Sequence, residues 1–377
     1  MPIQIAIIGL GNIAHKHAEV INALPDAELV AGVKRDAETG RAFCMQYGIP
    51  HYFQSAEDLL AWGEFDAAVI SCGHHFTVGI SQAILSTGRP CLIEKPVGFS
   101  AAETQSVLDA ATSAGTWGMV AVNRRFYSII QKARELICEA GGLRAIRVEH
   151  TEWMHQADGW GLSDDLLDRY FYINGIHLLD TMCHLAGLPE TTDAAVRKFP
   201  GRRNAYDAMF RFPTGAVGHY SGQWYAPGRW ALDLFAEDLR ITFPRMEEAL
   251  IHRTGKDPEP LALDEIDQKF KPGFYRQMQA FVEKAEKLKT EKLKGKTQAV
   301  VQNTEKLKGR IENPKSKILN PGSPLLSTPS SPSQNFSVSA FQYFSSLPCL
   351  LPEAVEIMSV VDSVASGKSA AHGRALP

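Results

Sequence analysis

The chain has 377 residues, 45% of them hydrophobic and 21% charged, and its formal net charge is −3. This length and composition predict two globular domains with large cores, and so small a net charge argues against broad electrostatic binding to nucleic acid or an anionic membrane. We expect no signal peptide, and no membrane span, because no apolar run approaches the ~20 residues that a span needs. The six cysteines lack the spacing of a zinc site or a disulfide framework, which favours a reducing, cytoplasmic location.

The first third of the chain, residues 1–122, alternates between apolar runs and segments with helical spacing. The strand candidates are 3–10, 27–33, 66–73, 90–96 and 116–123, and the helix candidates between them are 12–24, 36–48, 78–88 and 100–115. Continuous apolar runs of this kind are typical of parallel strands covered on both faces. The alternation predicts an α/β fold that begins with a doubly wound parallel sheet of the Rossmann type.

From residue 123 the pattern changes to longer elements with alternating burial. Helices are expected at 128–140 and 175–187, and strands at 143–153, 205–226 and 230–243, with a turn at Thr214–Gly215. These elements predict a second domain over 123–377, of the α+β type, with a mostly antiparallel sheet.

Residues 284–350 fit neither domain. The hexapeptide TEKLKG occurs twice in a Lys-rich stretch, at 290–295 and 304–309, and a Pro/Ser-rich stretch follows it. Such a composition predicts a disordered insertion, after which 352–367 has the pattern of a packed helix. The insertion could be a basic arm that binds nucleic acid or a solvated surface excursion; we favour the excursion and expect no nucleic-acid partner.

A glycine motif, G-x-G-x-x-A, closes the first predicted strand and opens the first helix. Gly9 permits a tight turn, Gly11 lets a pyrophosphate approach the backbone, and Ala14 lets the helix pack closely. The helix N-terminus would present free N–H groups to the phosphates. The position between strand and helix is the one a dinucleotide site requires. The alternative is a glycine turn in a related fold that has lost its cofactor.

The end of the second strand selects between the two nicotinamide cofactors. Lys34 and Arg35 occupy the tip and Asp36 follows them. Because two cations suit a 2′-phosphate, we favour NADP(H). If Lys34 points to solvent and Asp36 reaches the ribose, NAD(H) would bind instead.

A lysine follows the fourth strand, in the sequence LIEKPVGFS. Ligands bind at this carboxyl edge of an open α/β sheet. Glu94 and Lys95 therefore belong to the expected site, and a partly desolvated Lys95 could exchange protons near neutral pH. On its own, a lysine before a proline is more often a surface residue. The predicted cofactor contacts are Gly9, Gly11, Asn12, Ile13, Ala14, Lys34, Arg35, Cys72, His74, Glu94 and Lys95.

Four motifs together resemble the glucose–fructose oxidoreductase / inositol dehydrogenase (Gfo/Idh/MocA) family. They are G-x-G-x-x-A, E-K-P, NRRF at 123–126 and GIHLLD at 175–180, and the resemblance covers about residues 3–250 and the last helix. The resemblance implies a Rossmann domain, an open-faced second domain whose sheet forms a homodimer or homotetramer interface, and NAD(P)-dependent oxidation or reduction of a sugar, cyclitol or related polyol.

The resemblance also implies roles for individual residues. Lys95 matches the active-site lysine, His177 the catalytic histidine, and Asp180 the acidic residue one turn later. Hydride transfer at a secondary alcohol needs a proton partner, which histidine or lysine can supply at neutral pH. A helix histidine considered alone would more often be packed or capping. The predicted substrate contacts are Lys95, Asn123, Arg124, Tyr172, Asn174, His177 and Asp180.

Two positions depart from the family pattern. Many members have Asp or Asn four residues before the histidine, where this chain has Ile173. Many have Pro-Asn-x-x-His after the third strand, where this chain has Gly73, His74 and Thr77. We expect either a polar network rebuilt with His74, Asn174 and Tyr170 or Tyr172, or weakened catalysis. No carboxylate cluster accompanies His74 and His75, so no metal is expected.

The domain junction supplies further candidates. Of Arg124 and Arg125, one could contact a substrate hydroxyl or carboxylate and the other form a structural ion pair. Trp153, Trp160 and Trp224 could form an apolar wall for a sugar ring, although core packing is the commoner role of such residues. The sequence thus predicts an NADP(H)-preferring polyol oxidoreductase with catalytic Lys95 and His177. Its alternative is a nucleotide-binding regulator or scaffold of the same fold.

Overall fold

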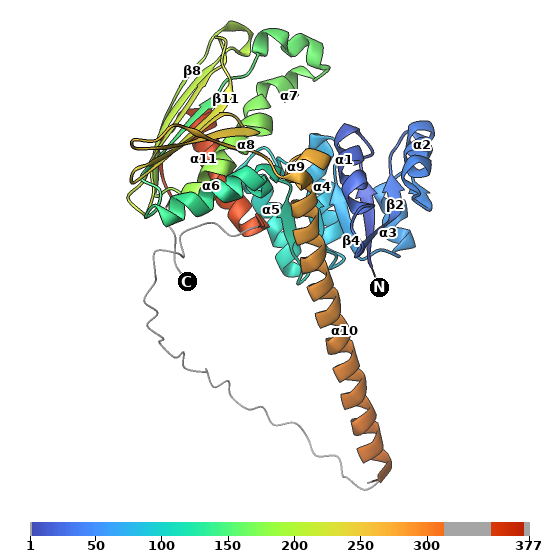
Figure 1. The fold of residues 1–377 in the computed structure, drawn as a ribbon. Helices are drawn as coiled ribbons and strands as arrows, with labels where there is room; N and C mark the ends of the chain where they lie inside the picture. Colours follow the sequence, from blue (N-terminus) through green and yellow to red (C-terminus); the bar gives the residue numbers. More distant parts are fainter. Residues whose placement is uncertain (1, 313–347, 373–377) are drawn as a thin grey trace, which may run out of the picture. The chain divides into compact units, whose positions relative to one another are not determined.

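Six parallel strands form the first sheet of the computed structural model, which describes residues 2–312 and 348–372 (Figure 1). Their order is β3-β2-β1-β4-β5-β6, so the strand order reverses between β1 and β4. The strands are β1 (Ile3–Ile8), β2 (Ala27–Val33), β3 (His51–Phe53), β4 (Ala67–Ile70), β5 (Cys91–Ile93) and β6 (Gly118–Val120). The α/β prediction is confirmed, and ligands of such sheets bind at the reversal point.

Helices cover both faces of this sheet, which is why its strands are apolar throughout. They are α1 (Asn12–Ile21), α2 (Ala37–Tyr47), α3 (Ala56–Trp62), α4 (His74–Leu85) and α5 (Ala101–Ser113). Ile5 and Ile7 pack in one cluster with α1 and α2, whereas Ala6 and Ile8 pack in the other with α4 and α5. The sequence did not predict β3 or α3, because a three-residue, partly exposed strand leaves no apolar run.

Nine strands form the second sheet, in the order β14-β13-β12-β11-β7-β10-β9-β8-β15. All neighbours are antiparallel except β10 and β7. The strands are β7 (Ala145–His150), β8 (Thr191–Arg197), β9 (Ala205–Arg211), β10 (Val217–Gln223), β11 (Trp230–Ala236), β12 (Leu239–Arg245), β13 (Glu248–Arg253), β14 (Glu259–Leu261) and β15 (Ala370–Ala371). The predicted, mostly antiparallel second sheet is therefore confirmed.

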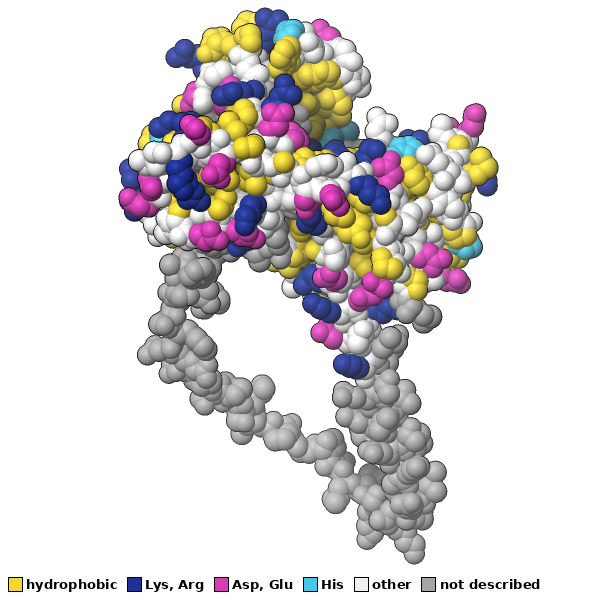
Figure 2. Space-filling model, in the orientation of Figure 1, with side chains coloured by type: hydrophobic (Ala, Val, Ile, Leu, Met, Phe, Trp, Pro, Cys, Tyr) yellow, Lys and Arg dark blue, Asp and Glu magenta, His cyan; other side chains and the backbone are white. Residues whose placement is uncertain are grey.

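In the part of the chain that the structure describes, helices pack on one face of the second sheet. They include α6 (Ser128–Glu139), α8 (Ile176–Ala186) and α11 (Leu351–Ser366), and α11 also packs against α5 of the first sheet. The shorter helical elements are η1 (Asn123–Phe126), η2 (Met154–Trp160), α7 (Asp164–Asp168), η3 (Phe171–Gly175), η4 (Pro200–Arg202) and α9 (Glu265–Lys269). On the other face, charged side chains such as Arg147 and Asp233 line an open hollow of about 540 Å³. Charges of both signs are interspersed on the face of the molecule that Figure 2 shows.

The chain divides into two compact units, Met1–Ala285 with Tyr343–Pro377, and Glu286–Gln342. One long helix begins in the first unit and continues into the second. This helix is α10 (Phe274–Glu312). The structure thus has a helix at 284–312, where we predicted disorder, because Lys, Glu and Leu are good helix formers. The remainder of the predicted insertion, 313–347, lies outside the described residues. Since the first sheet ends at Val120, we propose the domain division after residue 122.

Within the ranges that the structure describes, no helix is both long and apolar enough to cross a membrane.

Candidate active site

The glycine loop holds the backbone of β1 against that of β4. Gly9 has φ +92°, and a Cβ there would lie 2.4 Å from the Cα and N atoms of Cys72. The Ser71 hydroxyl donates to the Gly9 carbonyl at 2.8 Å. A Cβ on Gly11 would meet nothing within 4 Å. Gly9 is therefore required by packing, whereas Gly11 leaves open space beside the backbone.

Helix α1 begins beside this open space. Its N-terminal cap is Gly11, which offers no side-chain hydrogen bond, and its first turn carries no acidic residue. The first N–H groups of the helix, from Asn12 and Ile13 onward, are thus available to an anion. Ala14 is fully buried, as the close packing of helix on sheet requires. The loop and the helix end fit the pyrophosphate of a dinucleotide.

A cavity of about 660 Å³ lies at the carboxyl ends of β1, β2 and β4. Five predicted cofactor contacts line it, namely Gly9, Gly11, Lys34, Arg35 and Cys72. The position is the reversal point of the strand order, where open α/β sheets bind nucleotides. These residues fit the adenosine half of a nicotinamide dinucleotide.

The three charged residues at the end of β2 have different partners. The Asp36 carboxylate caps α2 by accepting a hydrogen bond from the Thr39 N–H at 3.0 Å. The Lys34 amine donates to the Leu10 carbonyl at 3.1 Å, so it does not simply point to solvent. The Arg35 guanidinium lies 5.5 Å from the ring centroid of the exposed Phe76. Arg35 is therefore the group at this end that is free to meet a ligand.

Lys95 lies two residues after the end of β5, and its peptide bond to Pro96 is cis. Its amine donates to the Ile173 carbonyl at 2.9 Å. Burial lowers the pKa of Lys95 to about 8, against the opposing effect of the Glu94 charge. A lysine of this kind is an ammonium at neutral pH but lies close to its titration range.

The neighbouring residue, Glu94, contacts helix α1 rather than Ile173. Its carboxylate lies 2.8 Å from His17 Nε2. Burial would raise the pKa of Glu94, but the hydrogen bond and charge of His17 and the charge of Lys95 lower it below its usual value. Glu94 thus supplies a buried negative charge beside Lys95.

His177 lies on α8, and its imidazole has no hydrogen-bond partner among the described residues; its Nδ1 atom is buried. Burial, followed by the charges of Arg124 and Lys95, lowers the pKa of His177 well below 6.5. The imidazole is therefore neutral at physiological pH and able to accept a proton. Because its pKa responds to Lys95, the two predicted catalytic groups lie within electrostatic reach of each other.

A series of hydrogen-bonded, mostly buried polar side chains lies near Lys95 and His177. Glu152 accepts from the Asn174 amide at 3.0 Å and lies 3.0 Å from His150 Nε2. The Asn174 amide also donates to the Tyr170 hydroxyl at 2.6 Å, and His150 Nδ1 contacts the Tyr220 hydroxyl. The rebuilt network therefore uses Asn174 and Tyr170, and its centre is Glu152, which we did not predict.

A sequence signal for Glu152 did exist. In the strand at 145–150 the buried side chains are those at even positions, Ile146 and Val148, and His150 and Glu152 continue that parity. Two polar residues at inward positions of one strand indicate a buried polar site.

Arg124 and Trp230 form a second feature that we did not predict as a pair. The guanidinium of Arg124 lies 4.6 Å from the indole centroid of Trp230. The same ring lies 5.9 Å, centroid to centroid, from the imidazole of His177. Arg124 and His177 thus contact the same indole ring, as a substrate contact and the predicted catalytic histidine would.

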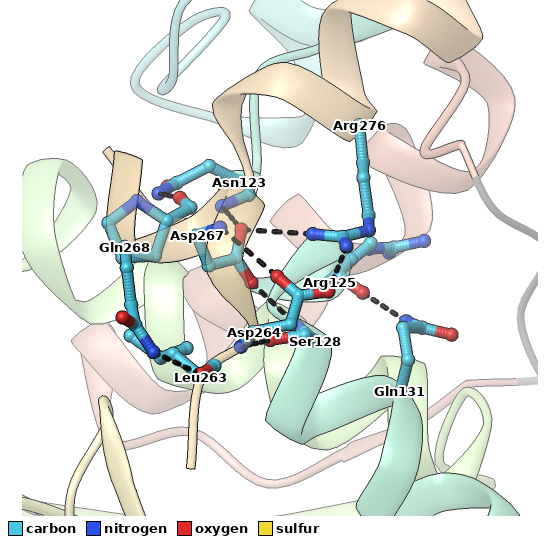
Figure 3. A network of polar contacts seen from close by, with 11 residues as sticks. Asn123, Arg125, Ser128, Gln131, Leu263, Asp264, Asp267, Gln268 and Arg276 are labelled. Carbon is cyan, nitrogen blue, oxygen red and sulfur yellow. Dashed lines mark hydrogen bonds and ion pairs between the residues drawn. The ribbon is translucent and has the colours of Figure 1, made fainter. Parts of the chain in front are cut away.

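Three predicted substrate contacts lie beside other protein groups. Asp180 is 1% exposed and pairs with Arg125 at 2.7 Å. The Asn123 amide donates to the Pro272 carbonyl at 3.0 Å, beside the polar network around Asp267 (Figure 3). Burial, followed by the nearby charge of Asp362, raises the pKa of the Tyr172 hydroxyl. The Asp180 carboxylate and the Asn123 amide thus have protein partners, and contact of these three residues with a substrate stays a prediction.

His74, which opens α4, lies near the lysine. Burial and the charge of Lys95 lower the pKa of His74 to about 4, so its imidazole is neutral. Thr77, at the position of the family's loop histidine, is buried. Among the residues that the structure describes, no group of three or more His, Cys, Asp or Glu could hold a metal ion.

Comparisons with known proteins agree with this geometry. Residues 3–122 match the model of an oxidoreductase family with an NAD-binding Rossmann fold, and residues 130–243 match the GFO/IDH/MocA C-terminal domain. The chain is 26% identical over 232 residues to the trans-1,2-dihydrobenzene-1,2-diol dehydrogenase of Bos taurus, covering 59% of this chain and 68% of that one. It is 29% identical over 191 residues to a putative UDP-kanosamine synthase oxidoreductase subunit of Amycolatopsis mediterranei (strain S699), covering 50% and 52%.

Among solved structures, an oxidoreductase from Agrobacterium radiobacter in complex with NAD+, L-tartaric acid and magnesium superimposes with a TM-score of 0.70. The match covers 100% of both chains at 15% identity, and it therefore shows a shared fold.

Proposed function

The chain belongs to the Gfo/Idh/MocA family of NAD(P)-dependent oxidoreductases, and from that premise we propose its reaction. The proposed reaction moves a hydride between a nicotinamide and a secondary alcohol or carbonyl carbon of a sugar, cyclitol or related polyol. The diol dehydrogenase of Bos taurus, a relative, supports an alcohol as the reacting group.

The observation that carries the proposal is the 2.9 Å hydrogen bond from the Lys95 amine to the carbonyl of Ile173, one turn before His177. The bound nicotinamide would supply the hydride acceptor or donor. The Lys95 ammonium would bind the reacting oxygen and stabilise its developing negative charge. The neutral His177 imidazole would accept the hydroxyl proton during oxidation and return it during reduction.

We further propose NADP(H) as the preferred cofactor. The exposed Arg35 guanidinium can form a charged fork with a 2′-phosphate. The Asp36 carboxylate, which would serve a ribose hydroxyl in an NAD site, is already bound to Thr39. Both observations favour the phosphorylated cofactor.

The test is a Lys95→Met variant assayed with NADP+ against a panel of polyols and sugars. We expect kcat/KM to fall at least about 100-fold, the range of lost acid–base or charge stabilisation, while nucleotide affinity measured by calorimetry stays within about twofold of wild type. Lys132→Met, which removes an exposed lysine on α6, is the matched control. Full activity of the Lys95 variant would refute the chemistry.

A second candidate rests on Ile173 and Thr77, which replace polar residues of the family pattern. On this alternative the chain is a nucleotide-binding regulator or scaffold with little turnover. Tight nucleotide binding by the wild-type protein, with no turnover of any polyol in the panel, would favour it.

We also propose a cytoplasmic homodimer or homotetramer that acts on a small molecule. The six cysteines are unpaired thiols, in keeping with a reducing compartment. The uncovered face of the second sheet is the surface on which copies would pair. Light scattering of the purified protein, compared with an Asp233→Arg variant on that face, would test the assembly.

A further inference from the structure

Two adjacent arginines in η1 have opposite surroundings. Arg125 is fully buried and pairs with Asp180 at 2.7 Å and Glu353 at 3.0 Å. Arg124 forms no ion pair with any described residue, and its Nε atom is buried without a hydrogen-bond partner. Arg124 is half-buried, and a buried guanidinium nitrogen without an acceptor is energetically costly. The unpaired state of Arg124 therefore needs an explanation.

The carboxylates around Arg124 are already bound to other groups. Glu152 is bonded to His150 and Asn174, each at 3.0 Å. Glu247 accepts a hydrogen bond from the Tyr127 hydroxyl at 3.4 Å. Among the described residues, none forms an ion pair with the Arg124 guanidinium, and its Trp230 contact is a cation–π interaction.

The position of Arg124 is that of a substrate anchor. Trp230 lies against both Arg124 and the His177 imidazole. Lys271, an exposed lysine between α9 and α10, lies near enough for its charge to lower the pKa values of Lys95 and His177. Lys271 forms no ion pair with any residue that the structure describes. Two cations without bound anions therefore flank the proposed reacting groups.

We propose that the substrate carries a carboxylate, which the Arg124 guanidinium binds through its planar fork. The substrate class would be polyhydroxy acids, such as aldonic or uronic acids, rather than neutral polyols. A carboxylate matches the geometry of a guanidinium fork, and each charged hydrogen bond made away from water is strong. This inference rests on the proposed function, because it names the substrate class of that same site.

The experiment uses pairs of compounds that differ only by a carboxylate in place of a hydroxymethyl group. These are D-gluconate with sorbitol, and D-glucuronate with D-glucose. Each is assayed with NADP+ and the full-length protein, and its binding to the enzyme–NADP+ complex is measured by calorimetry. We expect each acid to exceed its neutral partner at least tenfold in kcat/KM or in affinity.

The Arg124→Gln variant should lose that preference, so that the acid is reduced at least tenfold more than its neutral partner. Arg124→Lys should restore part of it. Arg211→Gln, which removes an exposed arginine from β9, is the control and should match wild type. Circular dichroism verifies that each variant is folded.

Three results would overturn the inference: equal binding of acids and neutral compounds, an acid preference that survives in Arg124→Gln, or no binding of either acid to the nucleotide complex. Failure of the wild-type protein to bind NADP+ or NAD+ would instead overturn the proposed function, so the two failures can be told apart.

Discussion

The Lys95 amine donates a 2.9 Å hydrogen bond to the carbonyl oxygen of Ile173, and this bond joins the loop after β5 to the π-helical turn η3. Ile173 is the position at which the resemblance to the family led us to expect Asp or Asn. Here the backbone supplies the acceptor, and such turns often occur at functional sites. The orientation of the lysine therefore does not depend on a polar side chain at residue 173.

The pH dependence of alcohol oxidation should reflect both catalytic groups. His177 acts as a neutral base, and because its pKa lies well below 6.5, kcat/KM should fall only well below pH 6.5. Lys95 acts as an ammonium, so kcat/KM should fall as pH rises through about 8. The charged or titratable groups that interact with Lys95 are Glu94, Arg124, Lys271, Glu152, His74 and His177.

The measurement is kcat/KM for the best substrate over the pH range in which the protein is folded. Lys95→Arg should move the alkaline decline to higher pH, since a guanidinium stays charged. A rate that continues to rise above pH 8 would mean that Lys95 acts as the base instead.

The two loop glycines should respond differently to alanine. Gly9→Ala places a Cβ 2.4 Å from Cys72 and forces a side chain into φ +92°, a strain of roughly 1–2 kcal/mol before the clash is counted. We expect a large loss of thermal stability. Gly11→Ala adds a Cβ in open space, so stability should change by no more than about 0.5 kcal/mol, while nucleotide affinity falls at least tenfold.

Thermal unfolding and nucleotide titration of both variants separate these effects. Unchanged nucleotide affinity in Gly11→Ala would show that the pyrophosphate does not lie against this backbone.

Local patterns were sufficient to predict most of the fold and the nucleotide loop. The apolar strands, Gly9 and Gly11 carry their information within a few residues, because strand burial and turn geometry are local properties. Lys95 and His177 were matched through motifs, and the structure brings them within electrostatic reach of each other. The contact that connects them, the hydrogen bond from Lys95 to the Ile173 carbonyl, depends on how two domains pack. No local sequence pattern predicts it.

The substrate side of the site was harder to predict for the same reason. Asp180 follows His177 by one helical turn, yet a neighbouring position on a helix does not fix which group a side chain meets. Arg125, which lies on η1, forms an ion pair with the Asp180 carboxylate. Conversely, Glu152 and Trp230 join the site from strands far along the chain, and only the packing of the second sheet brings them there.

Asp180 should therefore behave as a structural residue. Asp180→Asn leaves the buried Arg125 with Glu353 as its remaining carboxylate, and breaking such a buried pair costs about 3–5 kcal/mol. Glu353→Gln, whose side chain is 15% exposed, should cost less. Urea denaturation gives both values. Unchanged stability of Asp180→Asn together with a raised substrate KM would instead identify Asp180 as a substrate contact.

Cofactor choice should depend on Arg35. Removal of one charged hydrogen-bond partner is worth about 1.5–3 kcal/mol, so Arg35→Ala should weaken NADP+ binding at least tenfold and leave NAD+ binding within about twofold. Asp36→Asn is the control: asparagine caps a helix about as well as aspartate, so the variant should keep its stability and leave the preference unchanged, because Asp36 already serves Thr39. Calorimetric titration of both nucleotides checks each variant. Two results would show that the Asp36 carboxylate, rather than the Arg35 guanidinium, binds the ribose. One is tighter binding of NAD+ than of NADP+ by the wild-type protein, and the other is a change of cofactor selectivity in Asp36→Asn alone.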